Sequence, residues 1–219
     1  MPPTPLAPSM SPISAPTPVR STRRVRLGLA LLALAAAGLY FASETYLLSG
    51  HLGFPLDDSW IHLQFARNLA AGDGLSYNPG ERVTGSTAPL WTALLTPFFL
   101  GAGPDSFRGA DPAVTVGLAA GVQGLGILLY VFGVIATWAF ARELGLSRGF
   151  AALAGAWTAA TSWLVWSAVS GMEIPLFVLL SIGGMTLHLR ERRNPRRPPL
   201  SLGLFGLSAL ARPEGLALL

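Results

Sequence analysis

The chain has 219 residues, of which 51% are hydrophobic and only 12% charged, whereas soluble domains carry roughly 25% charged residues. Its net charge of +4 comes from arginine, because the sequence holds no lysine, and the absence of cysteine excludes disulfides and thiolate metal sites. The arginines gather at the ends of apolar runs, so membrane topology explains the basic balance better than a nucleic-acid partner does. The composition therefore predicts an integral membrane protein.

The first 26 residues are rich in Pro, Ser and Thr and poor in large apolar side chains. Such a composition cannot bury enough apolar surface to fold, so we expect a disordered tail over 1–26. The apolar run that follows, 27–48, is long enough to cross a bilayer and exceeds the roughly 7–15 apolar residues of a signal peptide. Four arginines directly before the run predict that the tail lies in the cytoplasm: Arg20, Arg23, Arg24 and Arg26.

A long polar segment, 49–112, follows the first predicted span and is expected to form an outer, periplasmic loop. Within it, the pattern of residues 57–71 predicts a helix that Gly72 ends, before a turn-rich stretch. The next apolar run, 89–103, holds about 15 residues, which is short for a membrane span. We expect this run to lie along the outer interface as a second juxtamembrane helix.

Four further apolar runs predict the remaining spans, at 113–141, 150–169, 174–189 and 200–219. With 89–103 outside the bilayer, the basic linkers 142–148 and 190–197 both fall in the cytoplasm, in agreement with the positive-inside rule. If 89–103 crossed instead, the more basic linker would face outward. The sequence therefore predicts an all-α protein with about five transmembrane helices. Because the last run is still apolar at Leu219, we expect the chain to be truncated at its C-terminus.

An adjacent acidic pair, Asp57 and Asp58, stands directly outside the first predicted span. Carboxylates that are solvated but lie beside apolar surface suit a general base, and they also suit the binding of a divalent cation. The alternative is structural, with Asp57 capping the helix and Asp58 favouring its first turn. The residues alone leave both interpretations open.

Two later motifs carry further charged residues. Glu173 lies in Gly-Met-Glu-Ile-Pro between two predicted spans on the outer side, where it either begins a helix or supplies another carboxylate. Arg212 and Glu214 lie in Ala-Arg-Pro-Glu-Gly, within the last predicted span. An ionisable pair inside a span marks either a functional site or an ion pair that fixes helix packing, and an arginine there suits a lipid phosphate.

These same segments carry a family likeness. The stretch DDSWIHLQFARNLAAGDGLSYNPGERVTGSTAPLW resembles the first periplasmic loop of bacterial GT-C-type polytopic glycosyltransferases, with the arabinofuranosyltransferase-like proteins as the nearest members. More distant relatives are the aminoarabinose transferases of lipid A and the protein O-mannosyltransferases. The segments SGMEIPLF and LARPEG recur at similar relative positions in such proteins, so the likeness covers about residues 25–219.

The resemblance implies transfer of a sugar from a polyprenyl-phosphate donor to a glycan, lipid or protein of the cell envelope, at the outer face of the bacterial inner membrane. Asp57 would then be the general base, and Asp58 would line the same pocket. The residues that would bind the acceptor or the donor phosphate are Glu173, Arg212, Glu214, Arg67 and Arg82. A divalent cation is the one candidate cofactor, and no metal ligands are assigned.

The likeness also implies a difference in length, because members of the family carry many more spans. We therefore expect residues 27–219 to form an incomplete GT-C fold, a fragment of a glycosyltransferase. The first alternative is a non-catalytic remnant or a membrane partner subunit. The second is a small transporter, which should place polar residues near the middle of paired helices, whereas this sequence concentrates them in one outer loop.

Overall fold

The computed structural model describes residues 19–47, 53–83, 85–102 and 112–219. These residues are almost entirely helical, which confirms the predicted all-α class. The strands among them, of three and two residues, form a short antiparallel hairpin. The elements in chain order are α1 (Val19–Leu47), α2 (Asp57–Ala71), β1 (Ser76–Asn78), β2 (Glu81–Arg82), α3 (Pro89–Ala102), α4 (Pro112–Glu143), α5 (Arg148–Ala160), α6 (Ser162–Val169), α7 (Ile174–Arg193), α8 (Leu200–Ala211) and the 3-10 helix η2 (Pro213–Leu218).

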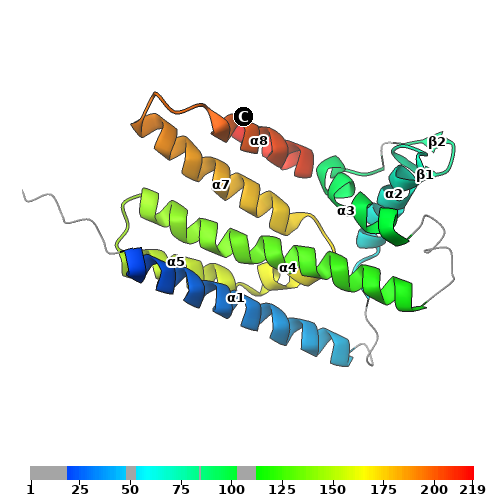
Figure 1. Cartoon of the computed structure of the whole chain (residues 1–219), viewed down its shortest axis with the longest axis horizontal. Coiled ribbons are helices and arrows are strands. Elements are labelled where there is room, and N and C mark those ends of the chain that lie inside the picture. Colours follow the sequence, from blue (N-terminus) through cyan, green and yellow to red (C-terminus); the bar gives the residue numbers. More distant parts are fainter. Residues whose placement is uncertain (1–18, 48–52, 84, 103–111) are drawn as a thin grey trace, which may run out of the picture.

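The long helices run side by side in one bundle, and α2, α3 and the β1–β2 hairpin pack together at one end of it (Figure 1). Helix α4 lies at the centre, where it contacts α1, α5, α6 and α7, while α8 packs on α7. Three of the helices are long and apolar enough to cross a membrane: Thr22–Leu47, Thr115–Glu143 and Ile174–Arg193. The chain is thus a helical protein with membrane-spanning character, as its composition predicts.

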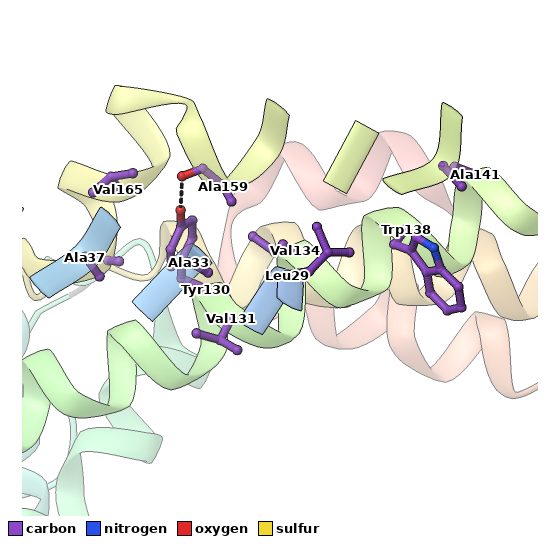
Figure 2. Packing of buried hydrophobic residues seen from close by; sticks show 12 residues of the cluster. Leu29, Ala33, Ala37, Tyr130, Val131, Val134, Trp138, Ala141, Ala159 and Val165 are labelled. Atoms are coloured by element: carbon purple, nitrogen blue, oxygen red, sulfur yellow. Dashed lines mark hydrogen bonds between the residues drawn. The ribbon is translucent and has the colours of Figure 1, made fainter. Parts of the chain in front are cut away.

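Small side chains allow the helices of the bundle to approach closely. Ala33 and Ala37, four residues apart on α1, are fully buried in one cluster with Tyr130, Val134 and Val165 (Figure 2). The Tyr130 hydroxyl of α4 donates a hydrogen bond of 2.7 Å to the carbonyl oxygen of Ala159 in α5, so this buried polar group is satisfied. Short side chains and the Tyr130–Ala159 hydrogen bond therefore hold α1, α4 and α5 together.

The outer surface of the bundle is apolar, as a bilayer requires. Large hydrophobic side chains are exposed along the helices that line it, among them Leu31 and Leu39 of α1, and Leu153 and Trp157 of α5. Soluble monomers rarely expose apolar surface so continuously. Lipid tails are the environment that such a surface matches.

The first helix begins earlier than the sequence predicts. Helix α1 starts at Val19, so the prediction that residues up to 26 form a disordered tail is wrong for 19–26, while 1–18 lie outside the described residues. Arginine is a good helix former, and the arginines that precede the apolar run continue its helix instead of ending it.

Two predicted spans are interrupted. The predicted span 150–169 is divided at Thr161, which has an extended conformation between α5 and α6. The predicted span 200–219 is helical only to Ala211 before the backbone opens at Arg212, with φ −152° and ψ 141°. Proline at the next position disfavours the helical conformation of the residue before it, which explains why α8 stops there. Arg212 therefore stands at the end of α8, not within a continuous helix.

The predicted outer helices are present. Helix α2 covers the predicted range of 57–71, and Gly72 ends it in the left-handed conformation at φ 89°. Helix α3 covers Pro89–Ala102 and is too short to count among the spanning helices. It packs against α2 and also contacts α8 and α4, so it lies over the end of the bundle (Figure 1).

Candidate functional site

Two hydrogen bonds attach the outer helices to the turn between α6 and α7. The Ser59 hydroxyl of α2 donates to the carbonyl oxygen of Ser170, and the Trp91 indole N–H of α3 donates to the carbonyl oxygen of Gly171 at 3.0 Å. All of these donors and acceptors are buried, where a hydrogen bond is costly to lose. The turn is therefore held in a fixed position against α2 and α3.

Glu173, two residues after Gly171, is the centre of a charged group. Its side chain is buried, with the residue 3% exposed. One carboxylate oxygen accepts a hydrogen bond of 2.8 Å from the Arg212 guanidinium, and the other lies 3.3 Å from Nε2 of His62 in α2. Arg212 also donates to Glu214, with distances of 2.9 and 3.3 Å to its two oxygens. Three distant segments of the chain thus meet at one carboxylate.

The polar group continues on the other side of the His62 ring. Nδ1 of His62 lies 3.5 Å from the Ser86 hydroxyl, which is 3.0 Å from the hydroxyl of Thr92 in α3. A neutral imidazole has one donor and one acceptor nitrogen. When Nε2, 3.3 Å from Glu173, carries the ring proton, Nδ1 is left to accept from Ser86. We name this set the outer cluster; its members are His62, Ser86, Thr92, Glu173, Arg212 and Glu214.

The charge of the outer cluster is unbalanced. Burial on its own raises the pKa of the Glu173 carboxyl, but the contact with His62, a backbone hydrogen bond and the charge of Arg212 together hold that pKa below its ordinary value. Glu173 is therefore ionised at neutral pH. With Glu214 also ionised, the cluster sets two carboxylates against the single guanidinium of Arg212.

A cavity opens beside these charges. Its volume is about 230 Å³, and it is lined by Thr87, Glu173, Arg212, Pro213 and Glu214. The Glu214 side chain is 60% exposed and that of Arg212 is 30% exposed, so both can meet a ligand from solvent. Two carboxylates and a hydroxyl are good partners for the hydroxyl groups of a sugar. A second anion would be repelled unless Arg212 met it directly.

The acidic pair lies apart from the outer cluster in its contacts. Asp57 and Asp58 are both exposed in the first turn of α2, where carboxylates interact favourably with the helix dipole. The capping residue is Leu56, so Asp57 does not cap the helix; instead its carboxylate accepts a hydrogen bond of 3.0 Å from the Asp58 backbone N–H. Among the described residues, no hydrogen bond or ion pair joins this pair to Glu173.

Arg67, another arginine predicted for the site, makes hydrogen bonds within α2. Arg67 is buried in α2, and its guanidinium donates to the side-chain oxygen of Asn68 at 3.0 and 3.2 Å. The Asn68 amide in turn donates to the carbonyl oxygens of Ser76 and Tyr77, so this pair of residues holds the hairpin on α2. Arg82 lies in β2, and its side chain is outside the described part of the structure.

His62 and Ser86 belong to the site, although few features of the sequence indicated them. The one signal was that His62 lies four residues after Asp58, on the same helix face. Within the described ranges, no group of three or more His, Asp or Glu side chains is arranged to hold a metal ion. The divalent cation considered from the sequence therefore has no three-ligand site in that part of the chain.

Fold and site together define a helical protein with three helices long and apolar enough to cross a membrane and a buried charged cluster where α2 and α3 meet the bundle. No protein-family model matches the chain, and no curated protein or solved structure matches it either. The family likeness thus rests on the residues of the sequence alone.

Replacing Gly171 by alanine is expected to loosen the attachment of α2 to the α6–α7 turn. Gly171 has φ +80°, and a Cβ there would lie 2.6 Å from the ring of Phe54 and 3.2 Å from Cβ of Ser59. Gly72, at φ +89° with nothing near its Cβ position, is the matched control, because both variants bear the same left-handed strain of roughly 1–2 kcal/mol. Because its Cβ is also overpacked, Gly171→Ala should lose about 1–3 kcal/mol more stability than Gly72→Ala. Thermal unfolding in detergent measures the difference, and equal losses would contradict close packing at the turn.

Proposed function

We propose that this chain forms part of a membrane glycosyltransferase of the GT-C type, which moves a sugar from a polyprenyl-phosphate donor to a cell-envelope acceptor. The observation that supports the proposal most is a convergence. The three segments that carry the family likeness, near 57–91, 170–177 and 210–215, are far apart in the sequence and meet in the outer cluster. Such a meeting is what a shared site for donor and acceptor would require.

The proposal includes five spans in the bacterial inner membrane, with the N-terminus in the cytoplasm. They are formed by α1, α4, α5 with α6, α7, and α8 with η2, which pass back and forth between the two ends of the bundle (Figure 1). Arginines gather at the end opposite the outer loop, at Arg26, Arg142, Arg148, Arg190 and Arg193. Positive charge on the cytoplasmic side is the arrangement that the positive-inside rule favours.

Single cysteines test this topology cleanly, because the chain has none of its own. Asn78, exposed at the tip of the hairpin, and Asn194, exposed after α7, are replaced by cysteine one at a time. A membrane-impermeant maleimide should label Asn78→Cys in intact spheroplasts and Asn194→Cys only after the membrane is opened. Labelling of Asn194→Cys from outside would overturn the five-span arrangement.

The cavity beside Glu173 is the place where the proposal seats the acceptor. Its hydroxyl groups would donate to the carboxylates of Glu173 and Glu214, which Arg212 keeps in position. Arg212 has five N–H donors, of which three are used in hydrogen bonds to these two glutamates. The remaining donors are available to a phosphate oxygen, so one arginine can order the acceptor pocket and contact the leaving group.

Asp57 and Asp58 do not line this cavity, so the proposed reaction requires the acceptor to extend from it to the first turn of α2. There Asp57 takes the proton of the acceptor hydroxyl while Asp58 helps to orient it. The acceptor oxygen forms a bond to the anomeric carbon, and the bond from that carbon to the phosphate oxygen breaks. The polyprenyl phosphate leaves with the bonding electrons and so gains a second negative charge. Arg212 stabilises that developing charge, and Arg67 or Arg82 would assist it if the donor reaches the hairpin. Fixed donors of this kind supply much of the rate acceleration in such sites.

The proposal is tested with proteoliposomes that contain the chain. They are incubated with polyprenyl phosphates linked to pentoses or hexoses, and released polyprenyl phosphate is measured by chromatography. Consumption of at least one donor above the level of empty liposomes is the expected result. If no donor is consumed, with or without an envelope extract as acceptor, the chain is not a glycosyltransferase on its own, and the remnant or partner-subunit interpretation takes its place.

A further inference from the structure

The end of the bundle opposite the outer cluster contains two adjoining cavities, of about 170 Å³ and 310 Å³. They share Glu143 and Arg190 in their walls. Four helices contribute to them, namely α1, α4, α5 and α7, together with the turn before α8. A ligand seated here would touch the ends of most of the bundle at once.

The walls of the two cavities are strongly basic. Glu143 is already engaged, because Arg190 and Arg193 each donate to its carboxylate at 2.7 Å. Counting every ionised side chain that lines the cavities gives a net charge of +5, from one glutamate and six arginines: Arg26, Arg142, Arg148, Arg190, Arg193 and Arg197. Glu143 is the one carboxylate among these lining residues, so the walls keep an excess of positive charge.

Trp138 supplies an independent sign of a missing ligand. It lines the smaller cavity and is 5% exposed, and the Arg26 guanidinium lies 5.0 Å from the centre of its ring. Its indole N–H is buried without a hydrogen-bond acceptor in the described part of the chain. Leaving such a donor unsatisfied is costly, so an acceptor oxygen from a bound molecule is expected next to it.

We propose that these cavities bind the phosphate headgroup of an anionic phospholipid. The arginines and the indole N–H would donate to the phosphate oxygens. Large apolar side chains stand exposed beside the arginines, at Leu144, Leu146 and Phe150, where acyl chains would lie. Basic pockets between membrane helices on the cytoplasmic side have the chemistry that such headgroups need. This binding site is independent of the proposed glycosyl transfer.

The simpler explanation is that these arginines only fix the topology of the chain. Topology depends on the number of positive charges near the ends of the spans, whereas a binding site depends on which residues line the cavities. Arg24 and Arg26 separate the two explanations, because both are exposed on the same turn of α1 and only Arg26 lines a cavity.

The experiment measures thermal unfolding of the chain in a neutral detergent with added phosphatidylglycerol, phosphatidylcholine or inorganic phosphate. At a saturating concentration, phosphatidylglycerol should raise Tm by about 5 °C. The zwitterionic lipid and inorganic phosphate should have much smaller effects. Equal shifts with phosphatidylcholine, or with inorganic phosphate alone, would overturn the assignment to an anionic lipid.

Three variants locate the effect. Trp138→Phe removes the unsatisfied N–H but keeps a ring beneath Arg26, and Arg26→Gln removes one cavity-lining charge. Both should lose at least half of the Tm shift caused by phosphatidylglycerol, while the matched control Arg24→Gln should keep it. If all three variants respond alike, the lipid effect is a matter of net charge and the binding site does not exist. Retained lipids counted by native mass spectrometry should decrease in the same two variants.

Discussion

Asn in place of Asp57 is expected to lower the rate of donor consumption by about 100-fold or more, because general-base catalysis contributes roughly 10²–10⁴-fold to a rate. Asparagine has nearly the size of aspartate and keeps a side-chain oxygen for the Asp58 backbone N–H, so the start of α2 should be unchanged. It cannot accept the proton of the acceptor. The rate is measured in proteoliposomes at saturating donor, with circular dichroism and Tm confirming that the variant folds.

Asp73→Asn is the matched control for this loss, since Asp73 is also an exposed carboxylate of the outer loop and lies beyond the end of α2. Its rate should stay within about threefold of the wild type, because a surface substitution away from a site has little effect. The structure also offers a competing base. Nδ1 of His62 lies 3.5 Å from the Ser86 hydroxyl, and its Nε2 lies 3.3 Å from the Glu173 carboxylate. A catalytic histidine has a similar pair of neighbours.

His62→Gln therefore decides which residue takes the proton. If Asp57 is the base, His62→Gln should change the rate only through the shape of the outer cluster, and Asp57→Asn should remove most of the activity. If instead Asp57→Asn keeps the wild-type rate and His62→Gln loses it, the assignment of Asp57 is wrong and the buried histidine is the base. The two variants lie on the same helix, so a general loss of α2 would affect both equally.

Sequence patterns predicted the parts of the structure that depend on local chemistry. Helix α2 ends where Gly72 allows a left-handed residue, and α7 begins with Pro175 in its first turn. The division of α8 from η2 could have been predicted as well, because Pro213 disfavours a helical Arg212 whatever the apolar run suggests. The prediction followed the hydropathy of the run and not the proline, so it placed Arg212 inside a helix. In the structure that helix ends at Ala211.

The convergence of the site could not be predicted, because it depends on how the helices pack. Ser59 and Ser170 are 111 positions apart, and nothing local to either one indicates the hydrogen bond between them. The same holds for His62, which has no motif of its own and gains its place only from the position of Glu173. The sequence supplied charged residues in three separate segments, and the packing of α2 and α3 on the bundle decided which of them meet.

Arg212→Gln is expected to be the most destabilising single change in the outer cluster. It should lower the free energy of unfolding by about 3 kcal/mol, which is the low end of the range for breaking a buried ion pair. Glu173 would be left buried and charged with only His62 beside it. The low end of the range applies because the Arg212 side chain is 30% exposed and water can replace part of the interaction. Unfolding by denaturant or heat in a fixed detergent measures the loss.

A double-mutant cycle with Glu173→Gln separates the penalty of the unpaired charge from the loss of packing. Neutralising Glu173 in the Arg212→Gln background should restore part of the stability, so the double variant should be more stable than Arg212→Gln alone. Arg193→Gln, which breaks an exposed Arg–Glu pair at the other end of the bundle, should cost less than about 1 kcal/mol and is the control. A double variant that is less stable than either single one would contradict a buried, charged Glu173.

The pH dependence of stability is a second measure of the charge on Glu173. The fold lowers the pKa of Glu173 below its ordinary value of 4.5, so its charge stabilises the protein above that value, and this contribution is lost as the pH falls through the lower pKa of the folded state. In Arg212→Gln the carboxylate has lost its 2.8 Å ion pair with the guanidinium, so its protonation should begin at a higher pH and should relieve the unpaired charge. The difference in free energy of unfolding between wild type and Arg212→Gln should therefore decrease as the pH is lowered from 7 to 4. A difference that increased would show that Arg212 does not hold Glu173 as an anion.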